Sequence, residues 1–197
     1  MSRGQRKVCS LIACWVVAVL LTLVWPAERE PVYKGKKLGN WLVDDLWISS
    51  TRFLGNPAKE AVREIGTNAL PFLERWIAYK PPAWRWPVVR TIEKGNRQVA
   101  SWFNDRKALR ADGAREAFYV LGDQASPAIP ELARLAQGRD RFVGLRAVAA
   151  LRGIGKATAP SLLCLLGNEQ VDVMVRSAAT NALLRIAPEV MQNSRAQ

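Results

Sequence analysis

The chain has 197 residues, 29 of them basic and 17 acidic, and its formal net charge at pH 7 is +12. This length suits one domain with an additional segment and allows a substantial buried core. The sequence has no histidine and only three cysteines. We therefore expect no imidazole base, no nucleophile that depends on one and no disulfide framework.

The first 25 residues have the composition of a membrane anchor. Residues 1–7 carry three basic side chains, and the uncharged, apolar segment 8–25 would form a helix about 27 Å long, enough to cross most of a bilayer core. We expect a transmembrane helix that is not cleaved. A cleaved signal peptide and a lipid-modified Cys14 are the alternatives. The end of the segment lacks the small residues of a cleavage site, however, and few apolar residues precede Cys14.

The charges on either side of segment 8–25 bear on its orientation. The basic residues in 1–7 favour a cytoplasmic N-terminus, because basic flanks tend to stay on the cytoplasmic side of a membrane. Basic residues within 29–37 weaken this preference. We predict a single-pass protein of the cell (inner) membrane whose domain lies outside the cytoplasm.

The next segments lead into a helical domain. Residues 26–37 have the composition of a polar linker, and residues 38–48 that of an amphipathic helix that caps one end of the domain. This helix is expected to bury large apolar side chains, namely Trp41, Leu42, Leu46 and Trp47. Asn56 followed by Pro57 is typical of a helix start, with Asn56 as the N-cap.

A nine-residue phrase is the strongest pattern in the sequence. It occurs at 58–66, 114–122, 147–155 and 179–187, as two alanines three residues apart, two larger apolar residues and a final glycine, which is Ala187 in the last copy. Apolar residues at i, i+3, i+4 and i+7 lie on one side of an α-helix. The alanines leave room for a neighbouring helix, and a glycine ends a helix because it adopts the left-handed conformation at low cost. The positions that we expect to pack or terminate the helices are Ala61, Ile65, Gly66, Ala117, Leu121, Gly122, Ala150, Ile154, Gly155, Ala182 and Ile186.

A proline follows each of the first three copies and opens a second apolar helix, since proline is tolerated in the first turn. These prolines are Pro71, Pro127 and Pro160; in the second copy Pro130 is the alternative, which makes that turn three residues longer. The final positions of the four copies are 56, 33 and 32 residues apart. Two of these intervals lie within the range of about 20–50 residues that is typical of stacked helical repeats.

This combination of features resembles the HEAT family of α-helical repeats. Residues 147–166 are similar to the alanine-rich HEAT-like repeats of bacteria, and residues 30–46 followed by 61–73 resemble the opening of bacterial membrane-anchored HEAT-repeat proteins. The resemblance implies an all-α fold. Residues 38–190 would form an α-α superhelix, a right-handed solenoid of antiparallel helix pairs, followed by a frayed tail at 191–197. It implies little about chemistry, because the signature residues of the family are packing residues.

A long interval, residues 78–111, separates the first two copies and is rich in tryptophan and basic residues. Short helices are expected at 88–92 and 99–103. In one interpretation, which we prefer, the tryptophans pack against the first repeats and the basic side chains remain solvated. In the other, the interval binds an anionic ligand, with arginines on phosphates and tryptophans stacked on bases. The candidate interaction surface consists of Trp84, Arg85, Trp86, Arg90, Arg97, Trp102 and Arg106.

The sequence shows no catalytic or ligand-binding constellation. Asp44 and Asp45 are its only adjacent carboxylates, and neighbouring helix positions point about 100° apart, so a solvated face explains them better than a shared substrate. Cys164 lies between leucines and is expected in the core. The cysteines lack metal-ligand spacing, and there is no phosphate-binding glycine loop. We expect no enzyme activity, no cofactor and no metal.

The resemblance to HEAT proteins implies a non-enzymatic scaffold or adaptor that binds an unidentified protein through an extended surface. Anionic lipid or an envelope polymer is a further electrostatic partner for a basic, tethered domain. The alternative is a nucleic-acid-binding protein of the DNA-alkylation-repair type, a class of HEAT-like folds with basic concave faces. A domain outside the cytoplasm makes nucleic acid an unlikely partner. Some HEAT-like proteins act as chaperones for a bound pigment, but no residue here specifically supports that role.

Overall fold

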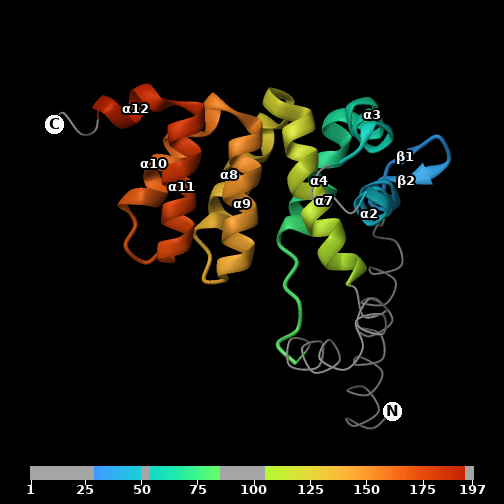
Figure 1. Cartoon of the computed structure of the whole chain (residues 1–197), viewed down its shortest axis with the longest axis horizontal. Helices are drawn as coiled ribbons and strands as arrows, with labels where there is room; N and C mark the ends of the chain where they lie inside the picture. The colour runs from blue at the N-terminus through green and yellow to red at the C-terminus, as the bar shows by residue number, and fades with distance from the viewer. Residues whose placement is uncertain (1–28, 50–53, 85–104, 194–197) are drawn as a thin grey trace, which may run out of the picture.

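The computed structural model describes residues 29–49, 54–84 and 105–193. In these ranges the protein is mostly helical, so the predicted all-α class is correct. Figure 1 shows the helices arranged side by side along the longest axis of the molecule.

A short β-hairpin precedes the helices, within the segment that the sequence predicts to be a linker. Strands β1 (Val32–Tyr33) and β2 (Lys36–Lys37) pair antiparallel, with Val32 opposite Lys37. The two turn residues, Lys34 and Gly35, have positive φ angles of 47° and 75°. Such turns twist in the same sense as the strands they join. Strands of two residues are too short to produce an alternating pattern, so the sequence contains no periodic signal for them.

Helix α2 (Leu38–Ser49) starts directly after the hairpin, close to its predicted bounds. Leu42 is fully buried, as expected. Trp41 is only half-buried, and its indole N–H donates a hydrogen bond to the carbonyl oxygen of Tyr33 at 3.1 Å. The predicted burial of Trp41 is therefore only partial, because its polar edge is turned toward the hairpin.

The remaining helices form pairs, each joined by a short turn. The pairs are α3 (Asn56–Ile65) with α4 (Leu70–Ile77), α7 (Arg106–Leu121) with α8 (Ile129–Ala136), α9 (Arg141–Ile154) with α10 (Ala159–Gly167), and α11 (Val173–Ile186) with α12 (Pro188–Asn193). The first three turns contain 3₁₀ segments, η1 (Gly66–Ala69), η2 (Gly122–Ala128) and η3 (Lys156–Thr158).

Glycines end the first helix of three pairs. Gly66, Gly122 and Gly155 are the C-caps of α3, α7 and α9, and their φ angles are 60°, 53° and 109°. A residue with a side chain is disfavoured in this region. In the fourth copy, Ala187 has φ of −150°, a region open to any residue. That difference explains why an alanine is tolerated there.

The prolines lie at the starts of the second helices. Pro71 and Pro160 occupy the first turns of α4 and α10. In the second pair, Pro130 takes this position in α8, whereas Pro127 lies inside η2. The turn is lengthened accordingly, since η2 has seven residues and η1 has four. Of the two alternatives in the sequence, Pro130 is the equivalent residue.

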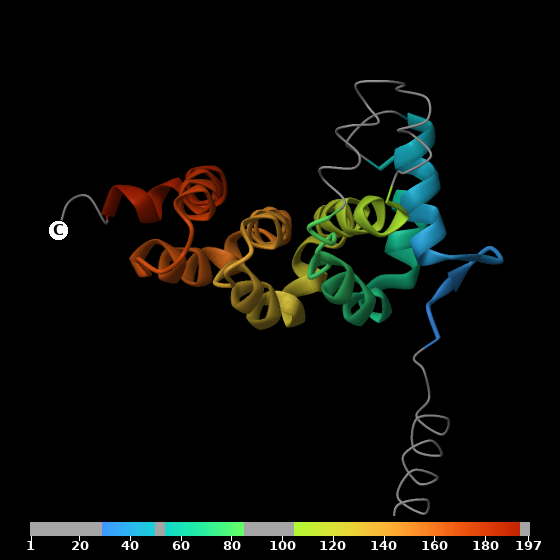
Figure 2. The same cartoon turned by 90° about the horizontal axis from the view of Figure 1, so that it is seen from below.

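The helices form two rows. Viewed end-on, α7, α9 and α11 lie in one row and α4, α8 and α10 in the other (Figure 2). The second helix of each pair packs against the first helix of the next, α4 against α7, α8 against α9 and α10 against α11. Each pair is thus held by its neighbour. Helix α2 packs against α3 and α7 at the N-terminal end of the described helices.

The core is a continuous cluster of buried apolar residues that extends from Leu38 to Ala187. The second alanine of each repeated phrase is buried in every copy: Ala61, Ala117, Ala150 and Ala182. The large residue before each turn is buried as well at Ile65, Leu121 and Ile154, whereas Ile186 is half-buried. The last copy is less covered because no further helix pair follows it among the described residues.

The prediction that Cys164 lies in the core is wrong. Its side chain is exposed on α10, whereas Leu162 and Leu165 are fully buried. Leu162 and Leu165 are three positions apart and share the inner face of the helix, so the cysteine between them faces outward. A run of apolar letters does not reveal which of its members face the core.

Helix α3 starts differently from the prediction, which made Asn56 the N-cap. Gly55 is the N-cap, with no side-chain cap, and its backbone N–H donates to the Asp45 carboxylate. Asp45 therefore has a structural contact. Asp44 forms ion pairs with Lys36 at 2.9 Å and, more weakly, with Arg106 at 3.7 Å. The prediction that these two carboxylates merely form a solvated face is therefore wrong, because both of them link α2 to neighbouring elements.

Several predictions concern parts of the chain outside the described residues. These are the transmembrane helix at 8–25, the side chains of Leu46 and Trp47, the short helices at 88–92 and 99–103, and residues 194–197 of the tail. The prediction that the tail is frayed from residue 191 is wrong for residues 191–193, which belong to α12. Within the described ranges, no helix combines the length and apolarity needed to cross a bilayer.

The closely packed alanines make a testable prediction. Replacing fully buried Ala150 with glutamate introduces a charge without a partner and overfills a helix contact. We expect Ala150→Glu to lower the free energy of unfolding by about 3 kcal/mol or more, measured by urea unfolding followed by circular dichroism. Exposed Ala157 is the matched control, and Ala157→Glu should behave like the unmodified protein. Equal unfolding midpoints for the two variants would contradict the packing described here.

Candidate functional site

Only part of the predicted interaction surface lies in the described residues. Trp84 is 64% exposed, so at this position the tryptophan does not pack against the repeats. Arg106 is also exposed, and it forms an ion pair with Asp44 of α2. The other members lie outside the described residues, namely Arg85, Trp86, Arg90, Arg97 and Trp102.

The two ends of the long interval are joined by a hydrogen bond. Tyr79, just after α4, donates its hydroxyl to Oδ2 of Asp105 at 2.5 Å. Asp105 is the N-cap of α7 and accepts the backbone N–H of Lys107 at 3.0 Å. Tyr79 near the start of the interval and Asp105 near its end are therefore held together.

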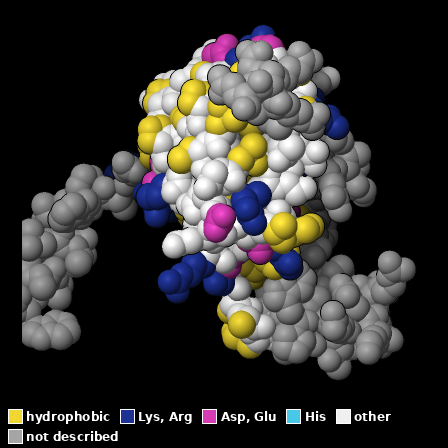
Figure 3. Space-filling model, turned by 90° about the vertical axis from the view of Figure 1, so that its left-hand side faces the viewer, with side chains coloured by type: hydrophobic (Ala, Val, Ile, Leu, Met, Phe, Trp, Pro, Cys, Tyr) yellow, Lys and Arg dark blue, Asp and Glu magenta, His cyan; other side chains and the backbone are white. Residues whose placement is uncertain are grey.

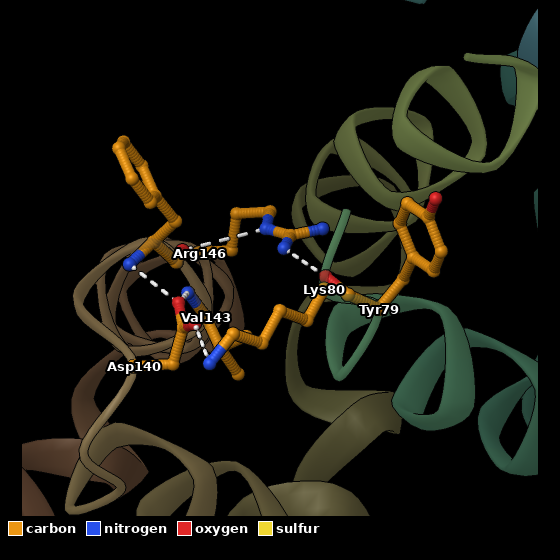
Figure 4. Close-up of polar contacts among 6 residues, drawn as sticks. Tyr79, Lys80, Asp140, Val143 and Arg146 are labelled. Carbon is orange, nitrogen blue, oxygen red and sulfur yellow. Dashed lines mark hydrogen bonds and ion pairs between the residues drawn. The ribbon is translucent and has the colours of Figure 1, made fainter. Parts of the chain in front are cut away.

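A second set of contacts holds the start of this interval, at Tyr79 and Lys80, against α9 (Figure 4). Lys80 forms an ion pair with Asp140 at 2.9 Å, and Arg146 donates to the carbonyl oxygen of Tyr79. Burial raises the pKa of the Asp140 carboxyl, but Lys80 and the amide N–H groups of Val143 and Phe142 outweigh it, so the pKa lies below its ordinary value. Burial lowers the pKa of the Arg146 guanidinium.

Aspartates cap the first helices of the last three pairs. They are Asp105 for α7, Asp140 for α9 and Asp172 for α11, and each side chain accepts a backbone N–H in the first turn. Such caps satisfy amide groups that the helix itself leaves without partners. Sequence reasoning missed these residues, although Asp140 and Asp172 both stand seven positions before the first alanine of their copy. That spacing is a usable signal.

A pocket in the described part of the protein lies between α3, α7 and α9. It has a volume of about 430 Å³ and is lined by three basic side chains, Lys59, Arg63 and Arg152. Glu116 and Tyr119 of α7 complete its polar wall. None of these five belongs to the surface predicted from the sequence, because three helices distant in sequence contribute to it.

Glu116 is the carboxylate in this pocket wall, and it is largely buried. Burial raises its pKa, while Arg115, Arg152 and Lys59 act in the opposite direction. The ion pair with Arg115 at 2.9 Å compensates the charge of the carboxylate directly. Its ion pair is therefore with an arginine outside the pocket lining, and the three cations of the pocket outnumber this single carboxylate.

Arg152 is held against Tyr119 by a close approach of two helices. Its Nε donates to the tyrosine hydroxyl, and its guanidinium carbon lies 5.3 Å from the centre of the ring. A Cβ atom added at the adjacent Gly153 would lie 2.9 Å from the Tyr119 nitrogen. Only glycine allows α9 to approach α7 this closely. The approach brings Arg152 and Tyr119 to the same pocket wall.

One end of the molecule exposes apolar side chains. Figure 3 views the C-terminal end and shows hydrophobic side chains gathered on part of it. Helix α11, which lies there, exposes Val173, Met174 and Leu184 to 66%, 54% and 46%. Exposed apolar groups on the last helix pair are expected where no further pair covers it.

The described residues contain no group of three or more His, Cys, Asp or Glu side chains that could hold a metal ion. What the pocket does offer is a set of basic groups beside apolar ones. Such a set can bind and orient an anion.

Comparisons with protein-family models, with curated proteins and with solved structures found no match to this chain.

The cap of α9 makes a prediction about stability and pH. Replacing Asp140 with alanine removes hydrogen bonds to two amides, so we expect the free energy of unfolding to fall by about 1 kcal/mol at neutral pH. Because the folded-state pKa is lowered, this contribution is present above the ordinary pKa of aspartate, near about 4, and is lost as the pH falls through the folded-state value. Urea unfolding of both proteins across this pH range measures the effect.

Asp172→Ala is the matched control, since Asp172 caps α11 but has no ion pair in the described part of the chain. The loss should be smaller for Asp172→Ala than for Asp140→Ala. A loss for Asp140→Ala that stays constant down to acid pH would show that the carboxylate charge is irrelevant there.

Proposed function

We propose that the protein is a non-enzymatic HEAT-like scaffold, an α-α superhelix tethered to the cell membrane by segment 8–25. Its helical domain lies outside the cytoplasm and binds another protein there. Segment 8–25 supports the tether by its length and apolarity, and the basic residues before it support the orientation.

The observation that carries this proposal is that the recurring residues of the nine-residue phrase pack between helices. Its second alanine and the large residue before the turn lie between helices, as with fully buried Ala150 and nearly buried Ile154. The residues that recur are therefore packing residues, and no chemical group recurs with them. Interlocked helix pairs offer an extended surface whose exposed positions are free to fit a partner. Binding is the function that such an arrangement supports best.

The distribution of charge favours a protein over a polyanion. Seven of the described basic side chains form ion pairs with carboxylates of the same molecule, as Lys34 does with Glu60 at 3.0 Å and Lys156 with Glu189 at 3.5 Å. A nucleic-acid surface needs basic groups that are free to neutralise successive phosphates. These ion pairs leave fewer cations for that purpose than the net charge suggests.

A photo-crosslinking experiment tests the scaffold role. A photoreactive amino acid is placed singly at Trp84 and at Val173, both of which are well exposed. We expect illumination of intact cells to give a protein adduct of discrete mass from at least one position. Buried Ala117 is the control position and should give none. A lack of any discrete adduct at both exposed positions would count against a stable protein partner.

Exposed Cys164 provides a native reporter of orientation. In spheroplasts we expect a membrane-impermeant maleimide to label the chain without lysis, because the proposed domain lies outside the cytoplasm. The Cys164→Ser variant should lose this labelling, which separates it from labelling at Cys9 or Cys14. Labelling of Cys164 that appears only after lysis would place the domain in the cytoplasm and revive nucleic acid as a partner.

A further inference from the structure

The pocket between α3, α7 and α9 carries more positive charge than its own residues compensate. Lys59 and Arg63 are one helical turn apart on α3 and repel each other. Within the described part of the protein, neither has a carboxylate within ion-pair distance. Arg152 likewise has no ion-pair partner there and contacts Tyr119 instead.

The ends of the helices offset only part of this charge. Arg63 and Arg152 lie in the last turns of α3 and α9, where the helix dipole contributes about half a negative charge each. Glu116 is already paired with Arg115. The three cations of the pocket therefore exceed the negative charge that faces them. A pocket with this balance attracts an anion.

The walls of the pocket also define what carries the anion. Buried Leu54, half-buried Val120 and the ring of Tyr119 provide apolar contact beside the basic groups. A volume of about 430 Å³ is at the lower end of the range for small-ligand pockets and accommodates a side chain with its neighbour. The nearby Glu116 carboxylate repels a doubly charged phosphate more strongly than a singly charged carboxylate.

We propose that this pocket binds an acidic side chain of the partner protein, an aspartate or glutamate next to an apolar residue. Lys59, Arg63 and Arg152 hold the carboxylate, and Leu54, Val120 and the Tyr119 ring contact the apolar neighbour. The inference rests on the proposed scaffold function and specifies one of its contact points.

The test uses a blocked dipeptide, N-acetyl-glutamyl-leucine amide, as the probe. Binding to the full chain in detergent micelles is measured by NMR chemical-shift perturbation of the labelled protein. The neutral analogue N-acetyl-glutaminyl-leucine amide has nearly the same size and should bind about tenfold more weakly, since charge-assisted hydrogen bonds are lost. Binding of the glutamyl probe should weaken as salt is added.

The variant Lys59→Gln with Arg63→Gln removes both cations of α3, neither of which has an ion pair among the described residues. Arg63 is exposed and Lys59 half-buried, so we expect the melting temperature to stay near that of the unmodified protein while the Kd for the glutamyl probe rises about tenfold. Arg185→Gln is the matched control, because Arg185 is an exposed arginine in the last turn of α11, far from the pocket along the chain. It should leave binding unchanged.

Three results would overturn the proposal. One is equal binding of the glutamyl and glutaminyl probes, and another is unchanged binding in the double variant. The third is tighter binding of phenyl phosphate than of the glutamyl probe, which would make the pocket a phosphate site. Crosslinks to a protein from Trp84 or Val173 that persist in the double variant would leave the scaffold function intact while the pocket assignment failed.

Discussion

Close contact between successive helix pairs is the constraint on which the rest of the structure depends. Each second helix packs against the first helix of the next pair, so no pair buries its apolar face alone. Small residues make this approach possible: Ala117 and Ala150 are fully buried, and a Cβ atom at Gly144 would lie 2.9 Å from a side-chain carbon of Val175 on α11. Glycine at this position lets α9 approach α11, just as Gly153 lets it approach α7. Helix α9 is therefore held tightly on both sides.

This packing also creates the functional geometry. Because Gly153 brings α9 close to α7, Arg152 lies over Tyr119 and forms one wall of the pocket. At the N-terminal ends of α7 and α9, the cap aspartates Asp105 and Asp140 contact Tyr79 and Lys80 and so fix the start of the long interval. The pocket and these contacts at the start of the interval share no residues. Both nevertheless depend on the same spacing between the helices.

Sequence periodicity predicts the parts of this structure that are local. The repeated phrase identifies the helices, and the glycines identify their ends, because helical period and left-handed φ are properties of a few consecutive residues. The same reasoning fails for Cys164, whose apolar surroundings do not indicate which face of α10 it occupies. It also fails for Asp45, whose partner Gly55 lies ten positions away in another element. The pocket was beyond prediction because α3, α7 and α9 come together only in the folded chain.

The contrast between net charge and local charge is the main guide to function. A charge of +12 suggests a general attraction to polyanions, but salt at physiological strength screens exposed charges beyond about 10 Å. Within that distance Lys34, Lys80 and Lys156 each face a carboxylate of their own chain. Among the described residues the three cations of the pocket have no ion pair, Glu116 is the one carboxylate beside them, and apolar walls lie next to them. The proposed selectivity for a small carboxylate therefore follows from where the described basic side chains lack ion pairs, and not from how many of them the sequence contains.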